Sequence, residues 1–202
     1  MSQTQPPTSK GAKQSQEILD AALRCLGRDG YAATSLSRVA DEAGVSKRMV
    51  LYYFDSREDL FVQLTRSIGE RLIALLEDAV AGIQDPAEVV SAGFSRMWDA
   101  ITSDRALLIA MFGVMTESVT DERLAEAVVD FKDSLRELLR KQLEDARAHG
   151  RRVVVDDDVA VTATMSGFFG LAVEWLETGD TPELAQTIAG YQQLVAGMAP
   201  PA

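Results

Sequence analysis

Apolar residues recur at helical spacing along almost the whole chain of 202 residues, and this feature restricts the fold more than any other. The first stripe falls at positions i, i+3, i+4, i+7 and i+8 of one amphipathic helix and comprises Ile18, Ala21, Ala22, Cys25 and Leu26. This helix is expected to stop near Gly30. Because no credible strand hairpin interrupts the helical pattern, the sequence predicts an all-α fold.

Stop and cap signals divide the rest of the chain into further helices. Asp85-Pro86, Ser103-Asp104 and Thr181-Pro182 are three of these breaks, and each proline suits the first turn of the next helix. The long helices are predicted at about 57–82, 86–102, 105–117, 121–148, 157–178 and 182–198. With three shorter helices before residue 57 they make about nine. The run Val153–Val155 alone looks strand-like and is expected to be an extended connector.

The same signals predict three segments. Residues 1–12 are polar, contain Pro6 and Pro7, and are expected to form a disordered arm. Residues 13–60 are expected to form an N-terminal three-helix domain with a helix-turn-helix motif at 35–54. A long helix then leads into a C-terminal helical domain, residues 61–202.

Charge is distributed unevenly between these segments. The chain carries a net charge of -11, yet residues 1–60 contain eight basic and eight acidic side chains, so the whole excess lies C-terminal to them. A neutral N-terminal module can present cations on one face, which nucleic-acid binding needs.

The sequence also predicts where the protein works. The single cysteine, Cys25, cannot form an internal disulfide and is expected in the core. The longest uncharged apolar run identified, 106–115, is too short to cross a membrane, and the N-terminus does not resemble a signal peptide. We therefore expect a cytoplasmic protein without a membrane partner.

Residues 34–54 read Thr-Ser-Leu-Ser-Arg-Val-Ala-Asp-Glu-Ala-Gly-Val-Ser-Lys-Arg-Met-Val-Leu-Tyr-Tyr-Phe. One short helix with an alanine-lined face is followed by a glycine turn at Gly44 and at once by a second helix, which is the pattern of a helix-turn-helix. Val45, Val50 and Phe54 can pack inward. The side chains left to project from the second helix are Lys47, Arg48, Met49, Leu51 and Tyr52.

The chemistry of these residues suits the major groove of DNA. Arg48 can bind a guanine edge with two hydrogen bonds, and Met49 or Leu51 can touch thymine methyl groups. Hydroxyls and cations suited to phosphates, or to capping the two helices, are those of Thr34, Ser35, Ser46, Lys47, Tyr52, Tyr53 and Arg57. The alternative is an ordinary three-helix packing unit with a solvated basic edge.

The run from Gly44 to Leu60, preceded by Gly30-Tyr31 and Thr34-Ser-Leu, resembles the DNA-binding domain of the tetracycline-repressor (TetR) family over residues 13–64. The resemblance implies a homodimeric regulator that binds an operator in double-stranded DNA and is released by a small-molecule effector. It implies DNA contacts by Thr34, Ser46, Lys47, Arg48, Met49, Tyr52, Tyr53 and Arg57, with Val50 and Phe54 in the core. Arg48, Met49 and Leu51 depart from the residues frequent in the family, so the operator sequence does not follow.

The C-terminal domain is then expected to bind the effector and to form the dimer. Flexible and aromatic side chains suited to an adaptable pocket for an apolar or aromatic ligand are Met97, Trp98, Ile101, Met111, Phe112, Met115, Phe131, Met165, Phe168 and Phe169. Each of them could equally be simple core packing. The last two helices are the expected dimer interface, through Thr164, Gly167, Gly170, Ile188, Tyr191, Leu194 and Val195, although small residues also suit a crossing within the chain.

Other function classes find little support. The sequence offers no catalytic constellation, no metal-ligand spacing and no cofactor motif, so we expect no enzyme. His149 is the only histidine and fits a solvated helix end. Asp156–Asp158 could hold a cation but suits a helix start better. A helical interaction protein that does not bind DNA remains the second alternative.

Overall fold

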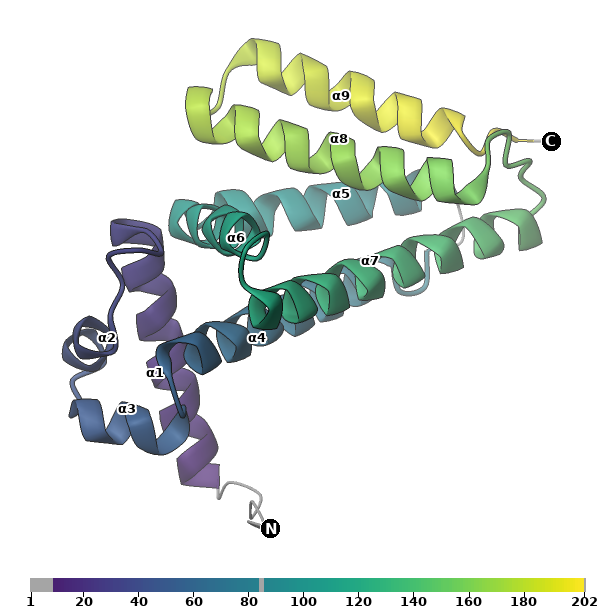
Figure 1. The fold of residues 1–202 in the computed structure, drawn as a ribbon. Helices are drawn as coiled ribbons and strands as arrows, with labels where there is room; N and C mark the ends of the chain where they lie inside the picture. The colour runs from purple at the N-terminus through teal and green to yellow at the C-terminus, as the bar shows by residue number, and fades with distance from the viewer. Residues whose placement is uncertain (1–8, 84–85, 202) are drawn as a thin grey trace. The chain divides into compact units, whose positions relative to one another are not determined.

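The computed structural model describes residues 9–83 and 86–201, and within these ranges the chain is helical with no strand (Figure 1). The helices are α1 (Ser9–Asp29), α2 (Leu36–Glu42), α3 (Lys47–Tyr53), α4 (Arg57–Val80), α5 (Pro86–Thr102), α6 (Arg105–Glu117), α7 (Glu122–Ala148), α8 (Asp157–Thr178) and α9 (Pro182–Gly197). The predicted all-α class is confirmed, and the predicted helices end within about two residues of the observed ones. The predicted arm is wrong for residues 9–12, which belong to α1, while residues 1–8 lie outside the described part.

The chain divides into two compact units, and their boundaries differ from the predicted one after residue 60. The first unit is Met1–Ile68 with Arg105–Val129, and the second is Gly69–Asp104 with Asp130–Ala202. α4 and α7 are continuous helices that contribute to both units. Residues 105–129, predicted to belong to the C-terminal domain, therefore group with the N-terminal helices.

The first unit is built around the buried face of α1. Ile18 and Cys25 have no exposed surface, and Val50 of α3 and Phe61 of α4 are fully buried in the same core. α6 lies against α1 so closely that a Cβ atom at Gly27 would stand 2.3 Å from Ala106 Cβ. Gly27 is thus a requirement of packing, because a larger side chain would force the two helices apart.

In the second unit, α9 packs against both α5 and α8, and Figure 1 shows it alongside α8. α8 and α9 approach closely at Gly167 of α8, where a Cβ atom would stand 2.3 Å from Tyr191 Cε2 of α9. The Tyr191 hydroxyl donates a hydrogen bond to the backbone carbonyl of Thr164. Gly167 therefore gives room to a ring of its own chain.

The acidic run Asp156–Asp158 at the start of α8 is used in capping and ion pairing. The Asp156 carboxylate caps α8 by accepting from the backbone N–H groups of Asp158 and Val159, at 2.9 and 3.3 Å. Asp157 pairs with Arg147, and Asp158 lies 2.8 Å from Arg140. No cluster of three metal-ligating side chains occurs among the described residues. The capping predicted from the sequence is thus observed for Asp156, whereas Asp157 and Asp158 form ion pairs with α7.

The connector between α7 and α8 pairs with the end of the chain. Arg152 N donates to Pro200 O at 3.1 Å and Val154 N to Met198 O at 2.9 Å, beside an antiparallel bridge between Arg151 and Pro201. The predicted extended connector thus pairs with a segment about fifty residues later in the chain. This pairing is too short to count as a strand.

One helix of the described residues, α8, is long and apolar enough to cross a membrane by length and composition alone. The search of the sequence for long apolar runs did not single out α8, because small and hydroxyl side chains interrupt its uncharged stretch. Only 33% of the most apolar 18-residue stretch of α8 is buried within the chain, so α8 exposes more apolar surface than a core helix would.

Candidate nucleic-acid interface

Two serine caps and one glycine shape the helix-turn-helix. Ser35 Oγ accepts from Arg38 N at 3.3 Å at the start of α2, and Ser46 Oγ accepts from Met49 N at 3.2 Å at the start of α3. Between the helices Gly44 has φ +66°, a left-handed conformation that most residues adopt only with strain. Local sequence thus fixes both the start of α3 and its turn from α2.

α3 has one buried and one exposed face. Val50 is fully buried, and Phe54, which follows the helix, is 2% exposed. The exposed face carries Tyr52, with 79% of its surface accessible, together with Lys47, Arg48, Met49 and Leu51. The structure therefore brings together all five residues predicted to project, while Tyr53 is half-buried and stands edge-on to Tyr52.

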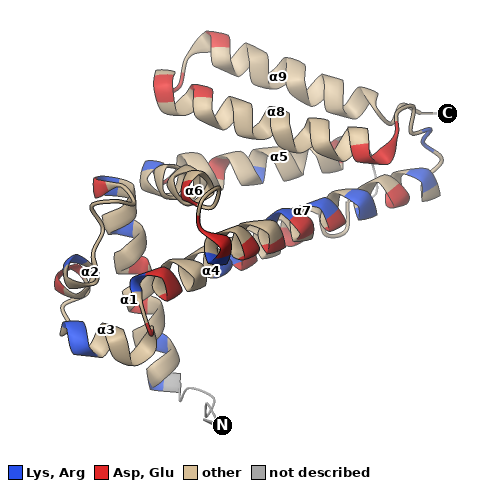
Figure 2. Ribbon diagram, viewed as in Figure 1, with Lys and Arg blue, Asp and Glu red and all other residues tan. Residues whose placement is uncertain are grey.

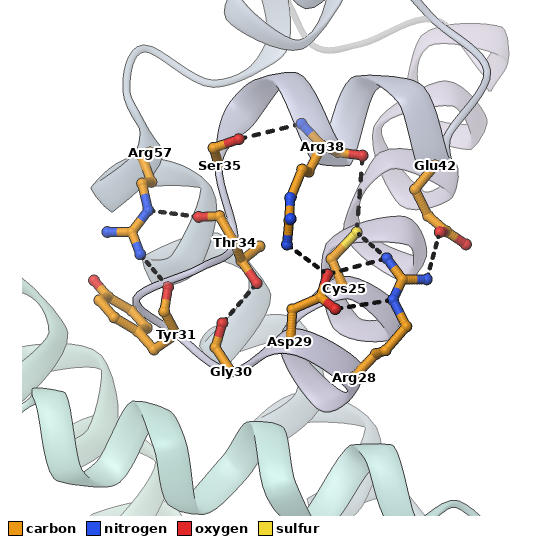
Figure 3. A network of polar contacts seen from close by, with 10 residues as sticks. All are labelled: Cys25, Arg28, Asp29, Gly30, Tyr31, Thr34, Ser35, Arg38, Glu42 and Arg57. Atoms are coloured by element: carbon orange, nitrogen blue, oxygen red, sulfur yellow. Dashed lines mark hydrogen bonds and ion pairs between the residues drawn. The ribbon is translucent and has the colours of Figure 1, made fainter.

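The cations of α3 differ from those of α1 and α2. Arg24 binds the Glu42 carboxylate at 2.9 Å. Figure 3 shows that Arg28 binds the same carboxylate, at 3.0 Å, and that Asp29 binds Arg28 and Arg38, at 3.1 and 3.2 Å. These hydrogen bonds hold the pKa of Asp29 and of Glu42 below the ordinary range, Asp29 chiefly through Arg28 and Glu42 chiefly through Arg24.

By contrast, no carboxylate of the described residues pairs with Lys47 or Arg48, and α3 carries no acidic residue (Figure 2). Their charge is therefore available to an anionic partner such as a phosphate backbone.

The phosphate contact predicted for Thr34 is wrong for its side chain. Thr34 is 1% exposed, and its hydroxyl donates to Gly30 O at 2.8 Å (Figure 3). Sequence reasoning missed this because a hydroxyl before a helix suits a cap and a buried turn equally well. The capping role goes to Ser35 alone.

Arg57 is a positioning residue in this structure. Its Nε donates to Thr34 O at 2.7 Å, a second nitrogen donates to Tyr31 O, and the guanidinium lies 4.3 Å from the Tyr31 ring centroid (Figure 3). Arg57 thus ties the first turn of α4 to the loop between α1 and α2. Its predicted phosphate contact stays a prediction, and three-quarters of its side chain is covered.

Cys25 lies beside the paired arginines but is not a reactive group. Burial, the largest cause, raises the pKa of its thiol, and the nearby Glu42 adds to this. Its sulfur lies 3.8 Å from Arg28 and from the Arg38 carbonyl. The thiol therefore stays neutral and acts as the predicted core residue.

The second unit contains a cavity of about 550 Å³ bounded by α4, α5, α7, α8 and α9. Four of the ten residues predicted to bind a ligand line it: Met97, Met165, Phe168 and Phe169. Trp98 stacks on Phe94 instead, and Ile101 is buried. Neither Phe131 nor the α6 residues Met111, Phe112 and Met115 line this cavity, and α6 belongs to the first unit.

Sequence reasoning missed several cavity residues. Phe94, Leu135, Leu138 and Leu139 line the wall. Their apolar stripes were visible in the sequence, but stripes do not show which helices surround a space.

The residues predicted for the dimer interface separate into two groups. Thr164, Tyr191 and Val195 line the cavity, and Gly167 accommodates Tyr191. Gly170 and Leu194 face outward, along a shallow groove between α8 and α9 that also contains Gly190. Leu194 is 71% exposed, whereas Ile188 is half-buried.

Residues 18–64 match the family described as bacterial regulatory proteins, tetR family. The chain is 41% identical over 78 residues to the HTH-type transcriptional regulator BetI of Rhizobium meliloti, which covers 37% of each protein. It is 23% identical over 205 residues to the HTH-type transcriptional repressor KstR2 of Rhodococcus jostii, which covers 98% of each. Among the first relatives, the matches span 37% to 61% of the relatives' own length.

A similar fold occurs in the transcriptional regulator FadR of Bacillus subtilis, solved in complex with stearoyl-CoA. The TM-score is 0.79 at 17% sequence identity, over 89% of this chain and 96% of that one. This likeness shows the fold.

Proposed function

We propose that this chain, whose residues 18–64 match the tetR family of bacterial regulatory proteins, is a cytoplasmic repressor that binds an operator as a homodimer and leaves it when an effector binds. The observation that carries the proposal is the exposed face of α3. It combines two cations, Lys47 and Arg48, that pair with no carboxylate of the described residues, with exposed apolar and aromatic side chains on a helix anchored by Val50. This is the surface that a major groove accepts.

The dimer is supported by the outward face of α8 and α9. Residues 159–173 and 184–201 carry no charged side chain, and these helices expose Val173 and Leu194 (Figure 2). A second copy of the chain would cover the exposed apolar surface of α8. Leu194 of each copy would then lie over the groove at Gly170 and Gly190 of the other. Two-fold symmetry would match a pseudo-palindromic operator with half-sites about 34 Å apart.

The effector site is the cavity of the second unit. Its volume of about 550 Å³ falls in the range of small-molecule sites, and its wall is mainly apolar. α4 joins both units, so a ligand that shifts it could change the spacing of the recognition helices. To reverse a 99:1 occupancy, the ligand needs a preference of about 5.5 kcal/mol for the DNA-incompetent state. The proposal involves no catalysis.

Selection of bound fragments from random DNA, followed by electrophoretic shift across a salt series, tests the proposal. We expect enrichment of a two-fold symmetric sequence and a negative slope of log affinity against log salt, because Lys47 and Arg48 displace counterions. A protein that binds no duplex even at low ionic strength would leave a helical interaction protein as the better description.

A further inference from the structure

One side chain of the second unit, Tyr191 of α9, borders two hollows at once. It lines the cavity together with Thr164 and Phe168 of α8. It also lines the shallow groove between α8 and α9, together with Gly170 and Leu194. Tyr191 therefore stands between the proposed effector site and the surface proposed for the dimer.

The Tyr191 ring is held from both sides. Towards the cavity, its centroid lies 5.8 Å from that of Phe94. Towards the groove, it covers Gly167, where a Cβ atom would stand 2.3 Å from Cε2 and 3.1 Å from Cζ. Its hydroxyl donates to the backbone carbonyl of Thr164. Burial raises the pKa of this hydroxyl to about 12, so the proton that it donates is kept at neutral pH.

The two sides of the ring differ in the space that they offer. On the cavity side Phe94 and Phe168 are packed together, with ring centroids 5.3 Å apart. On the groove side, a Cβ atom at Gly170 or at Gly190 would meet nothing within 4 Å. Because packed side chains yield little, a ligand that presses on Tyr191 from the cavity displaces its ring towards the open groove.

The groove is also the place that the proposed dimer needs. Leu194 follows Tyr191 by three positions and lies on the same face of α9. It is 71% exposed, and in the proposed dimer the partner's Leu194 would occupy this groove. A displaced Tyr191 ring takes up the same space. A ligand in the cavity and a second copy in the groove therefore compete through this one side chain.

We propose that Tyr191 is a positioning residue that couples the cavity to the dimer: a ligand in the cavity pushes its ring into the groove and weakens the association of the two subunits. This inference rests on the proposed function for the effector site and for the dimer. It adds a second route to operator release beside the shift of α4. Because coupling of binding free energies is reciprocal, dimerisation must weaken the ligand by the same total factor.

The test is sedimentation equilibrium of the full-length protein, without DNA, in the presence and absence of N-phenyl-1-naphthylamine. This neutral aromatic probe suits a cavity with a mainly apolar wall, and its fluorescence reports binding. We expect a saturating amount of the probe to raise the dissociation constant of the dimer by about tenfold or more.

Two substitutions of Tyr191 separate coupling from a merely structural role. Tyr191→Leu removes the ring and keeps an apolar side chain, so the probe should bind but leave the dimer constant unchanged. Tyr191→Phe keeps the ring and frees it from the Thr164 carbonyl. It should keep the coupling and bind the probe about fivefold more tightly, because displacing the ring no longer breaks a hydrogen bond. A hydroxyl that only supports the cavity wall would give weaker binding in this variant.

The control for the place of binding is Leu139→Trp. Leu139 of α7 lines the cavity and not the groove, so the larger ring should fill the cavity and lower the affinity for the probe at least tenfold. A probe that does not bind, or that binds Leu139→Trp as it binds the parent, would overturn the proposal. A parent dimer that the probe does not weaken, or a Tyr191→Leu dimer weakened as much as the parent, would do the same. A parent protein that is monomeric at every concentration would refute the dimer of the proposed function, and this inference with it.

Discussion

The exposed faces of α3 and of the α8–α9 pair both carry large apolar side chains, but in opposite electrostatic settings. On α3, Met49 and Leu51 stand beside Lys47 and Arg48, and no carboxylate of the described residues neutralises these cations. Over the outward part of α8 and α9, Leu194 stands among glycines with no charge. Apolar surface next to unpaired cations fits a nucleic acid, whereas uncharged apolar surface fits another protein. The comparison teaches that exposure alone does not identify a partner.

The largest expected effect tests the uncharged face. Leu194→Asp should convert the dimer to a monomer and lower operator affinity at least a hundredfold, because symmetry would bury two unpaired carboxylates. Light scattering coupled to gel filtration measures the mass. Leu194 is 71% exposed, so the chain itself should fold normally. Val119→Asp, at a residue 83% exposed in the first unit, is the control and should change neither property. A Leu194→Asp dimer would place the interface elsewhere.

The next effect concerns what holds α3 in place. Arg57→Ala should leave the carbonyls of Thr34 and Tyr31 without their donor and destabilise the first unit by about 2 kcal/mol. Hydrogen exchange read by mass spectrometry should show α2 and α3 exchanging about thirtyfold faster. Arg48→Ala is the matched control, because Arg48 pairs with nothing in the described structure. Unchanged exchange with weaker DNA binding would instead make Arg57 a phosphate contact.

A smaller effect separates reading of bases from binding of phosphates on α3. Arg48→Ala should relax the choice at one base pair of each half-site by about 1–3 kcal/mol, because a two-pronged contact with guanine is lost. Lys47→Ala should weaken all duplexes alike and reduce the salt slope by about 0.9 for each phosphate contact removed. Competition shifts at fixed salt compare the two variants. If both discriminate operators like the parent protein, neither residue contacts DNA as proposed.

How far the sequence predicts this molecule depends on whether a signal is local. Gly30, Gly44, Pro86 and Pro182 act within one turn of a helix end, so the helix limits followed from them. Periodicity within a single helix likewise predicted which side chains of α3 are exposed. The grouping of α6 with the first unit depends on a contact 79 positions apart, Gly27 with Ala106. The one signal of this contact in the sequence was a glycine, Gly27, inside an amphipathic helix.

The same distinction explains the site. Lys47 and Arg48 were found because they sit on a helix whose buried face is recognisable, whereas Thr34 was misjudged because its burial depends on the fold of the Gly30–Thr34 loop. Cavity residues were recovered only in part. Whether an apolar side chain such as Phe94 or Met111 lines a space or fills a core depends on several helices at once.

The smallest effect concerns the paired charges near α3. The pKa values of Asp29 and Glu42 in the folded state lie below their ordinary values. Their contribution to the free energy of unfolding is therefore fully present above the unfolded-state pKa, near 4, and is lost as the pH falls through the lowered folded-state values. Exchange of α2 amides should therefore quicken below about pH 4, relative to the intrinsic rate. Glu42→Gln should flatten that dependence, while Asp41→Asn, on the same helix, should not. Because the arginine partners Arg24, Arg28 and Arg38 are more than half exposed, the change in stability should stay small, and added salt should reduce it further. A pH dependence in Glu42→Gln as steep as in the parent would mean that the network of Figure 3 orders the arginines without stabilising the fold.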